Sequence, residues 1–274
     1  MAKHAGYCYG VERAFNMVEV TASKNDRPIT TLGPLIHNRQ AIEALHKDKN
    51  VSMADSLEQI ESGTVVIRTH GVGPEVIQAA KKRGLDLIDA TCPFVRSVQK
   101  LAAKLVEAGY TLVVLGERNH PEVIGVTAHA GGRAIVIEDP AEIEQYLPLK
   151  RVGIVVQTTQ PLDKLEKLIE KLLPHCKDLN IQNTICYATT DRQEAARKLA
   201  REVQVMVVVG GRHSGNTRRL VDICKEEQVG VHHIETANEL EHGQFDGIDT
   251  VGVTAGASTP GFIIDAVVEA LLRF

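Results

Sequence analysis

Residues 113–122, VVLGERNHPE, join an apolar run to a glycine turn, a histidine and a proline that suits the first turn of a helix. The order of apolar residues, glycine and then His or Ser, without the proline that follows His120, also occurs in residues 31–39 (TLGPLIHNR) and residues 207–216 (VVVGGRHSGN). Short continuous apolar runs are typical of buried parallel strands. Ligands of α/β proteins bind beyond the carboxyl ends of such strands. The sequence therefore predicts one type of ligand-binding turn in three places.

A cysteine and a helical pattern precede each of these turns. The cysteine lies 24 or 25 residues before the glycine in all three cases. The pairs are Cys8 and Gly33, Cys92 and Gly116, and Cys186 and Gly210. Apolar residues spaced by three and four predict the helix between them, as in Val95, Val98, Ala102 and Leu105. One element order found three times indicates an internal repeat.

Strands that alternate with helices predict an α/β fold with parallel sheets. In each repeat a further strand ends in a polar pair, and another helical pattern follows it. We therefore predict three similar α/β domains, at residues 1–90, 91–183 and 184–274. No linker rich in proline, glycine or serine separates them, so we expect the domains to pack tightly.

Composition excludes several classes of protein. The 274 residues carry a formal net charge of −4, which argues against a nucleic-acid partner. No run of eighteen apolar residues predicts a membrane span. The N-terminus lacks the apolar stretch of a secretory signal, so we expect a cytoplasmic protein. In that reducing compartment five cysteines are not expected to form disulfides.

The three equivalent cysteines are candidate metal ligands. Each precedes or opens a helix, where free N–H groups lower the pKa of a thiol. Three thiolates on a common axis leave one coordination position open, which suits zinc with a bound water. It equally suits a [4Fe–4S] cluster with one iron not bound by cysteine. A single cysteine is usually a packing residue, as we expect for Cys176 and Cys224.

Polar residues at the turns form a second candidate set. His37, His120 and Ser214 are predicted equivalents, and so are His70, Ser258 and either Thr158 or Thr159. Imidazoles, hydroxyls and helix N-termini suit a phosphate or diphosphate. Asn216, at a helix start, would add an amide donor. For Ser214 and Asn216, helix capping is the alternative role.

Glu122 is the one carboxylate in this set. We align it with Arg39 in the first repeat and with Asn216 in the third. An acid near a metal and an anion is what proton delivery requires. The alternative is a glutamate that complements the dipole at a helix N-terminus.

Five motifs together resemble the 4-hydroxy-3-methylbut-2-enyl diphosphate reductase family over essentially the whole chain. They are residues 6–11 (GYCYGV), 89–93 (DATCP), 120–123 (HPEV), 185–193 (ICYATTDRQ) and 254–258 (TAGAS). The resemblance implies a three-domain trefoil around a [4Fe–4S] cluster bound by Cys8, Cys92 and Cys186. It implies reductive removal of the substrate hydroxyl, giving isopentenyl and dimethylallyl diphosphate. This is the last step of the methylerythritol phosphate route to isoprenoids.

The resemblance also implies residue roles. Glu122 would deliver protons, with Thr158 in the relay. The allylic diphosphate would be bound by His37, His70, His120, Thr158, Ser214, Asn216 and Ser258. Some members have serine at position 215, so Gly215 would contribute a backbone N–H instead. A ferredoxin or flavodoxin is the expected electron donor.

The sequence departs from the family at its N-terminus, where the first strand is expected to be shortened or absent.

Three other functions compete with the resemblance. Residues 210–217 follow an apolar strand and resemble the sequence motif of a phosphate-binding P-loop, but they lack the lysine of that motif. A zinc hydrolase accounts for the three cysteines but not for the imidazoles and hydroxyls. An iron–sulfur sensor does not account for Glu122.

Overall fold

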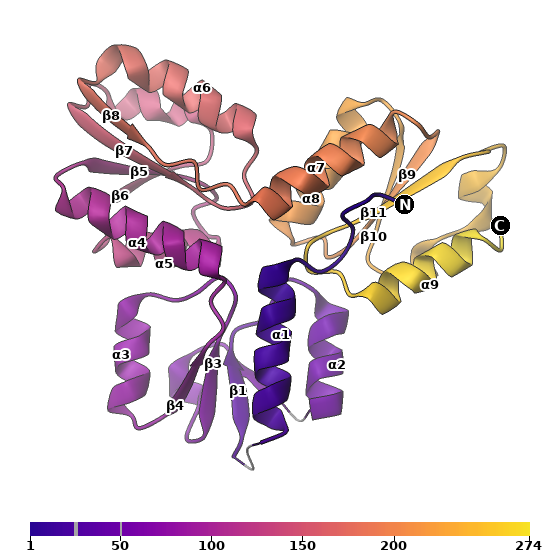
Figure 1. Cartoon of the computed structure of the whole chain (residues 1–274), viewed down its shortest axis with the longest axis horizontal. Helices are drawn as coiled ribbons and strands as arrows, with labels where there is room; N and C mark the ends of the chain where they lie inside the picture. Colours follow the sequence, from indigo (N-terminus) through magenta and orange to yellow (C-terminus); the bar gives the residue numbers. More distant parts are fainter. Residues whose placement is uncertain (25–26, 50) are drawn as a thin grey trace. The chain divides into compact units, whose positions relative to one another are not determined.

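The computed structural model describes residues 1–24, 27–49 and 51–274, and its strands form parallel sheets with helices packed on them (Figure 1). The strand orders are β2-β1-β3-β4, β6-β5-β7-β8 and β10-β9-β11. Neighbouring strands run parallel in all three sheets. The predicted α/β fold class is confirmed.

The strands are short, as buried strands of parallel sheets usually are. The first sheet contains β1 (Ile29–Leu32), β2 (Val51–Ala54), β3 (Thr64–Ile67) and β4 (Asp86–Asp89). The second contains β5 (Thr111–Leu115), β6 (Ala134–Ile137), β7 (Arg151–Val156) and β8 (Asp178–Ile181). The third contains β9 (Val205–Val209), β10 (Gly230–Ile234) and β11 (Val251–Ala255).

Helices connect these strands. They are α1 (Tyr9–Ala22), α2 (Arg39–Lys49), α3 (Pro74–Lys82), α4 (Pro93–Glu107), α5 (Pro121–His129), α6 (Leu162–Leu172), α7 (Tyr187–Ala200), α8 (Gly215–Glu226) and α9 (Gly261–Leu271). Short 3₁₀ turns add η1 (Leu57–Gln59), η2 (Pro140–Tyr146), η3 (Leu173–His175), η4 (Ala237–Glu239) and η5 (His242–Phe245).

Strand β5, an inner strand of the second sheet, is apolar on both faces because helices cover both faces of the sheet. Val113 and Leu115 pack into a buried cluster on the α6 side. Leu112 and Val114 point the other way and pack with α4 and α5. Figure 1 shows α6 on one face of this sheet and α4 and α5 on the other. The continuous apolar run in the sequence follows from this two-sided burial.

The third sheet repeats this arrangement. Val205, Val207 and Val209 of β9 pack with α9. Met206 and Val208 pack with α7 and α8. The same alternation along β5 and β9 supports the interpretation of the sequence as a repeat.

The chain divides into two compact units. One contains Met1–Glu12, Ile36–Asp48 and Tyr187–Phe274, and the other contains Arg13–Leu35 and Lys49–Cys186. The three domains at 1–90, 91–183 and 184–274 stay a prediction. In the described part of the chain, no helix combines the length and the apolar character needed to cross a membrane.

The N-terminal segment contains no strand within residues 1–8. Its contact with the third sheet includes a hydrogen bond from the Ala2 N–H to the Val253 carbonyl, at 2.8 Å. The strand that precedes a cysteine in the other repeats, β4 before Cys92 and β8 before Cys186, has no counterpart before Cys8 in the described residues.

Candidate functional site

The three predicted metal ligands occupy equivalent positions, each directly before a helix. Cys8, Cys92 and Cys186 stand directly before the first residues of α1, α4 and α7. Each cysteine N–H donates to the carbonyl of a turn that follows a strand: Ala257 for Cys8 (3.1 Å), Thr69 for Cys92 (2.9 Å) and Thr158 for Cys186 (3.0 Å). No cysteine in the described residues forms a disulfide. The prediction that each cysteine precedes or opens a helix is confirmed.

The other two cysteines have different surroundings. Cys224 is fully buried on α8 among apolar side chains, and this burial raises the pKa of its thiol to about 11. Burial also raises the pKa of Cys176, which packs beside the second sheet. A thiol that resists ionisation is a poor metal ligand, because the thiolate is the binding form.

The cysteine hydrogen bonds also fix the register of the strand-end turns. They pair Thr69, Thr158 and Ala257 as equivalents. The next residues along the chain are then His70, Thr159 and Ser258. Of the two threonines considered as the counterpart of His70 and Ser258, the structure selects Thr159.

The alignment of the residues that begin α2, α5 and α8 differs from the predicted one. Asn38 caps α2 through a bond from the Ala41 N–H to Asn38 Oδ1, at 2.9 Å. His120 caps α5 by accepting from the Glu122 N–H, and Ser214 caps α8 by accepting from the Thr217 N–H. Asn38, and not His37, is therefore the equivalent of His120 and Ser214.

The expectation that Arg39 matches Glu122 is wrong for the same reason. The turn from Gly33 to the capping residue is one residue longer than the turns after Gly116 and Gly210. Gln40 consequently takes the position of Glu122 and Asn216, two residues after the cap. The Gln40 Oε1 atom is buried and has no hydrogen-bond partner among the described residues, while the Arg39 side chain is exposed and paired with Glu43.

Glu122 and Thr158 form the most completely buried polar pair of the predicted site. Their exposed fractions are 2% and 6%. The Thr158 N–H donates to Glu122 Oε1 at 2.7 Å, and the Thr158 hydroxyl donates to Oε2 at 2.8 Å. Burial raises the pKa of Glu122 to about 7, although both Thr158 bonds act to lower it. This carboxyl group can therefore gain and lose a proton near neutral pH.

His70 and His120 lie together beside this pair, in the same unit. Their rings meet edge to face with centroids 5.2 Å apart. The Glu122 N–H donates to His120 Nδ1 at 3.2 Å. A neutral His120 must then carry its proton on Nε2, where it can be donated to an anion.

The Gln157 side chain links the turn after β5 to the turn that contains Thr158 and Thr159. Its side chain accepts a bond from the Glu117 N–H at 2.9 Å and donates to the Thr159 hydroxyl at 3.1 Å. A Cβ at Gly116 would lie 2.8 Å from the Gln157 side chain, so only glycine leaves room for this contact. The sequence did not predict a role for Gln157, because neither motif nor apolar periodicity identifies a buried amide side chain.

The unit with the third sheet holds the remaining predicted residues. Asn216 is 4% exposed, and neither atom of its side-chain amide has a hydrogen-bond partner among the described residues. Buried amides are usually paired, so this pair of atoms is suited to a ligand. Ser214 accepts a bond from the Thr217 N–H at 3.4 Å, and Ser258 donates to the His37 carbonyl at 3.2 Å. Gly215 is the first residue of α8.

The predicted site residues are thus divided between the two units. Cys8, His37, Ser214, Gly215, Asn216 and Ser258 lie in one, and Cys92, Cys186, His70, His120, Glu122 and Thr158 lie in the other. Within the units the structure brings together Glu122 with Thr158, His70 with His120, and Ser258 with the His37 backbone.

One protein family matches nearly the whole chain. The LytB protein family matches residues 1–272. A 4-hydroxy-3-methylbut-2-enyl diphosphate reductase of Aquifex aeolicus is 44% identical over 270 residues, covering 97% of this chain and 93% of the relative. The enzyme of the same name from Geobacter sulfurreducens is 43% identical over 274 residues, covering 100% and 96%.

Two solved structures are similar to this chain along most of its length. A structure of (E)-4-hydroxy-3-methyl-but-2-enyl diphosphate reductase, the terminal enzyme of the non-mevalonate pathway, is 42% identical with a TM-score of 0.76. It covers 100% of this chain and 98% of that one. The E-1-hydroxy-2-methyl-but-2-enyl-4-diphosphate reductase of Plasmodium falciparum is 28% identical with a TM-score of 0.91, covering 98% and 86%. By sequence and by fold, this chain belongs to the LytB family.

Proposed function

We propose that this protein reduces 4-hydroxy-3-methylbut-2-enyl diphosphate to isopentenyl and dimethylallyl diphosphate, the last step of the methylerythritol phosphate route to isoprenoids. The single observation that carries the proposal is the Glu122–Thr158 pair, a buried proton-exchanging group at the N-terminus of α5. Relatives over 40% identical along nearly the whole chain are named for this activity.

The three helix-opening cysteines fit a [4Fe–4S] cluster with one iron not bound by cysteine. Cys8, Cys92 and Cys186 share one backbone environment, because each stands directly before a helix and donates its N–H to the carbonyl of a turn that follows a strand. The predicted trefoil would bring the three sulfurs to one centre. Such a cluster, when bound, supplies single electrons and an iron with Lewis acidity toward the substrate oxygen.

The anion donors of both units fit the diphosphate. They are the side chains of His37, His70, His120, Thr158, Ser214, Asn216 and Ser258, and the backbone of Gly215. His120 offers its Nε2 proton because Nδ1 is already an acceptor. Asn216 offers an amide with no competing partner in the described residues. The N-terminus of α8 adds N–H groups and the positive end of a helix dipole.

Glu122 supplies the proton that the leaving group needs. The reaction consumes two electrons and two protons, breaks the C–O bond and releases the hydroxyl as water. Hydroxide is a poor leaving group, so an acid must protonate it as the bond breaks. Thr158 fixes the carboxyl group through both oxygens and takes part in the proton relay. Protonation of the allylic product at either end accounts for two isomers.

Electrons must arrive one at a time at such a cluster. We therefore assign a ferredoxin or flavodoxin as the electron donor. The cytoplasm is the proposed place of reaction. No nucleic acid and no membrane enters this scheme.

The test is turnover by anaerobically reconstituted protein with an artificial one-electron donor. Both diphosphate products should form, at a rate proportional to the iron–sulfur content. Protein that has not been reconstituted is the control and should be inactive. The proposal is overturned if protein with full iron–sulfur absorption leaves the substrate unreduced, or if zinc is the only metal that it binds.

A further inference from the structure

Arg192 is a charged side chain buried inside the protein. It lies on the second turn of α7, and 6% of it is exposed. Its Nη1 atom donates to the Ala188 carbonyl at 2.7 Å, and its Nη2 atom donates to the Gly6 carbonyl at 2.7 Å. Burying a guanidinium is costly unless it is hydrogen-bonded, so these contacts indicate a specific role.

Both acceptors of Arg192 lie next to predicted cluster ligands along the chain. Gly6 precedes Cys8 by two residues, and Ala188 follows Cys186 by two residues. Gly6 has a positive φ of 91°, and a Cβ there would lie 3.0 Å from Ile264, so the backbone at Gly6 is tightly constrained. Together with the bond from the Cys8 N–H to Ala257, the Arg192 bond fixes the segment on both sides of Tyr7.

Arg13 makes a similar contact in the other unit. It lies on α1, five residues after Cys8, whereas Arg192 lies six residues after Cys186. Its Nη1 atom donates to the Thr91 carbonyl at 3.3 Å, directly before Cys92. In two repeats, therefore, an arginine from a cysteine-opened helix binds the backbone that carries another repeat's cysteine.

We propose that Arg192 is a positioning residue for Cys8 that also sets the reduction potential of the cluster, with Arg13 as its counterpart at Cys92. This inference rests on the proposed [4Fe–4S] site. Reduction adds negative charge, so a nearby desolvated guanidinium favours the reduced cluster. Arg192 thus makes electron uptake easier and holds the Cys8 segment in its ligating conformation.

The experiment compares Arg192→Met and Arg192→Lys in the full-length protein reconstituted anaerobically. The readouts are the reduction potential from an EPR-monitored titration and the half-life of the cluster under a chelator. Arg192→Met should lower the potential and shorten the half-life several-fold. Arg192→Lys keeps the charge but not the two-pronged geometry, so its potential should lie nearer to that of the unmodified protein.

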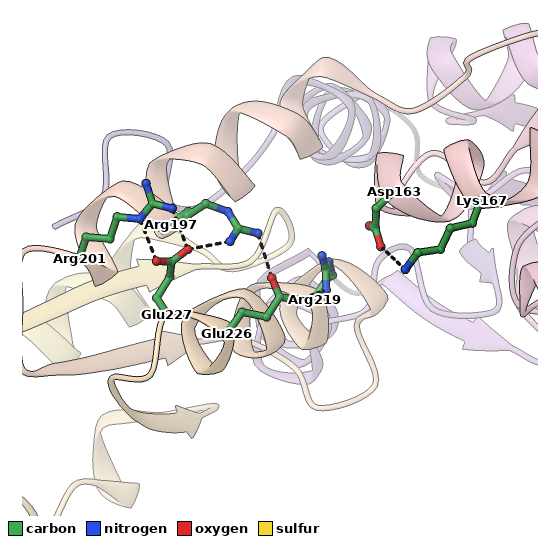
Figure 2. Close-up of polar contacts among 7 residues, drawn as sticks. All are labelled: Asp163, Lys167, Arg197, Arg201, Arg219, Glu226 and Glu227. Atoms are coloured by element: carbon green, nitrogen blue, oxygen red, sulfur yellow. Dashed lines mark hydrogen bonds and ion pairs between the residues drawn. The ribbon is translucent and has the colours of Figure 1, made fainter. Parts of the chain in front are cut away.

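Arg197→Met is the matched control on the same helix. Arg197 also makes two contacts, to Glu226 at 2.9 Å and to Glu227 at 2.7 Å, and Figure 2 shows both of them. Its loss should destabilise α7 without changing the potential. If Arg197→Met lowers the potential as much as Arg192→Met does, the effect is general destabilisation and the inference is overturned.

Alkylation of Cys8 gives a readout that does not need the cluster. In protein before reconstitution, Arg192→Met should increase the rate of Cys8 modification by iodoacetamide several-fold, measured by mass spectrometry, while Arg197→Met should not. A normal potential, cluster half-life and alkylation rate in Arg192→Met would overturn the inference. If the unmodified protein takes up no cluster, the proposed function fails, and the alkylation rates alone then decide the positioning role.

Discussion

Thr158 binds both oxygens of the Glu122 carboxyl group, through its backbone N–H at 2.7 Å and its hydroxyl at 2.8 Å. The backbone bond fixes the group whatever its protonation state. The hydroxyl can donate to an ionised carboxylate or accept from a protonated one. With a pKa raised to about 7 by burial, Glu122 is poised between these two states.

Glu122→Gln should therefore lower turnover by about 10²–10⁴-fold, the typical contribution of a positioned acid. Glutamine keeps the size of the side chain and its bond from the Thr158 N–H, but it cannot donate and regain a proton. Iron content and substrate affinity should stay near normal, because the carboxyl group is neither a cluster ligand nor an anion donor. Steady-state turnover beside substrate affinity on the same sample gives the comparison.

Glu166→Gln is the matched control, because this glutamate is exposed on α6. It should leave turnover unchanged. Near-normal turnover of Glu122→Gln would contradict the assigned role and direct attention to the substrate diphosphate as the proton source.

The stability of the protein should also depend on Glu122. Its pKa is about 7 in the folded protein and about 4.5 in the unfolded chain, so the unfolded state loses its proton first as pH rises. Stability is consequently lost between pH 4.5 and 7, by on the order of 3 kcal/mol in total. Glu122→Gln should remove this loss, so its advantage in unfolding free energy should appear above pH 7 and vanish below pH 4.5.

Denaturant unfolding at pH 4.5, 7 and 9 would measure this difference. A gap between the two proteins that stays constant over this range would show that Glu122 titrates normally.

Replacement of each cysteine by alanine should separate them into two groups. The Cys8, Cys92 and Cys186 variants should lose the cluster, and the Cys176 and Cys224 variants should keep it. The reason is that the first group shares one helix-opening position, while the second group has thiols whose pKa is raised by burial. Iron content after anaerobic reconstitution is the measurement. Iron lost from the Cys224 variant and kept by the Cys186 variant would refute the assignment.

Asn216→Leu should weaken anion binding without unfolding the protein. Its buried amide has no partner in the described residues, so leucine removes an unpaired polar group and should not lower the unfolding free energy. The rise in melting temperature produced by saturating inorganic diphosphate should be lost. Thr254→Val is the control, because the Thr254 hydroxyl is also buried and lacks a partner in the described residues. It should keep the diphosphate effect.

The sequence predicted the elements of this fold well because each has a local cause. The apolar run that precedes Gly210 lies in β9, and the helix predicted between Cys92 and Gly116 is α4. The residue register at the turns was less predictable. Counting from Gly33 misses the extra residue before Asn38, and only the capping hydrogen bond reveals that Gln40 matches Glu122.

Buried polar residues were missed for a different reason. Arg192 lies four residues before Ala196 and therefore falls on the buried face of α7. Apolar periodicity predicts this face from its apolar residues, so it gives no sign that a charged residue is buried there. Its acceptor Gly6 is 186 residues away in sequence. The burial of Glu122, which sets its pKa, depends likewise on packing that no local pattern specifies.

The acceptors of the three cysteine N–H groups also impose an order on maturation. Cys92 and Cys186 bind carbonyls that precede them in the chain, at Thr69 and Thr158, so their anchors are already synthesised when each cysteine emerges from the ribosome. Cys8 must wait for Ala257, which is synthesised 249 residues later. The N-terminal cysteine is then the last of the three to be anchored during synthesis, and a chain that stops short of Ala257 leaves it without its backbone partner.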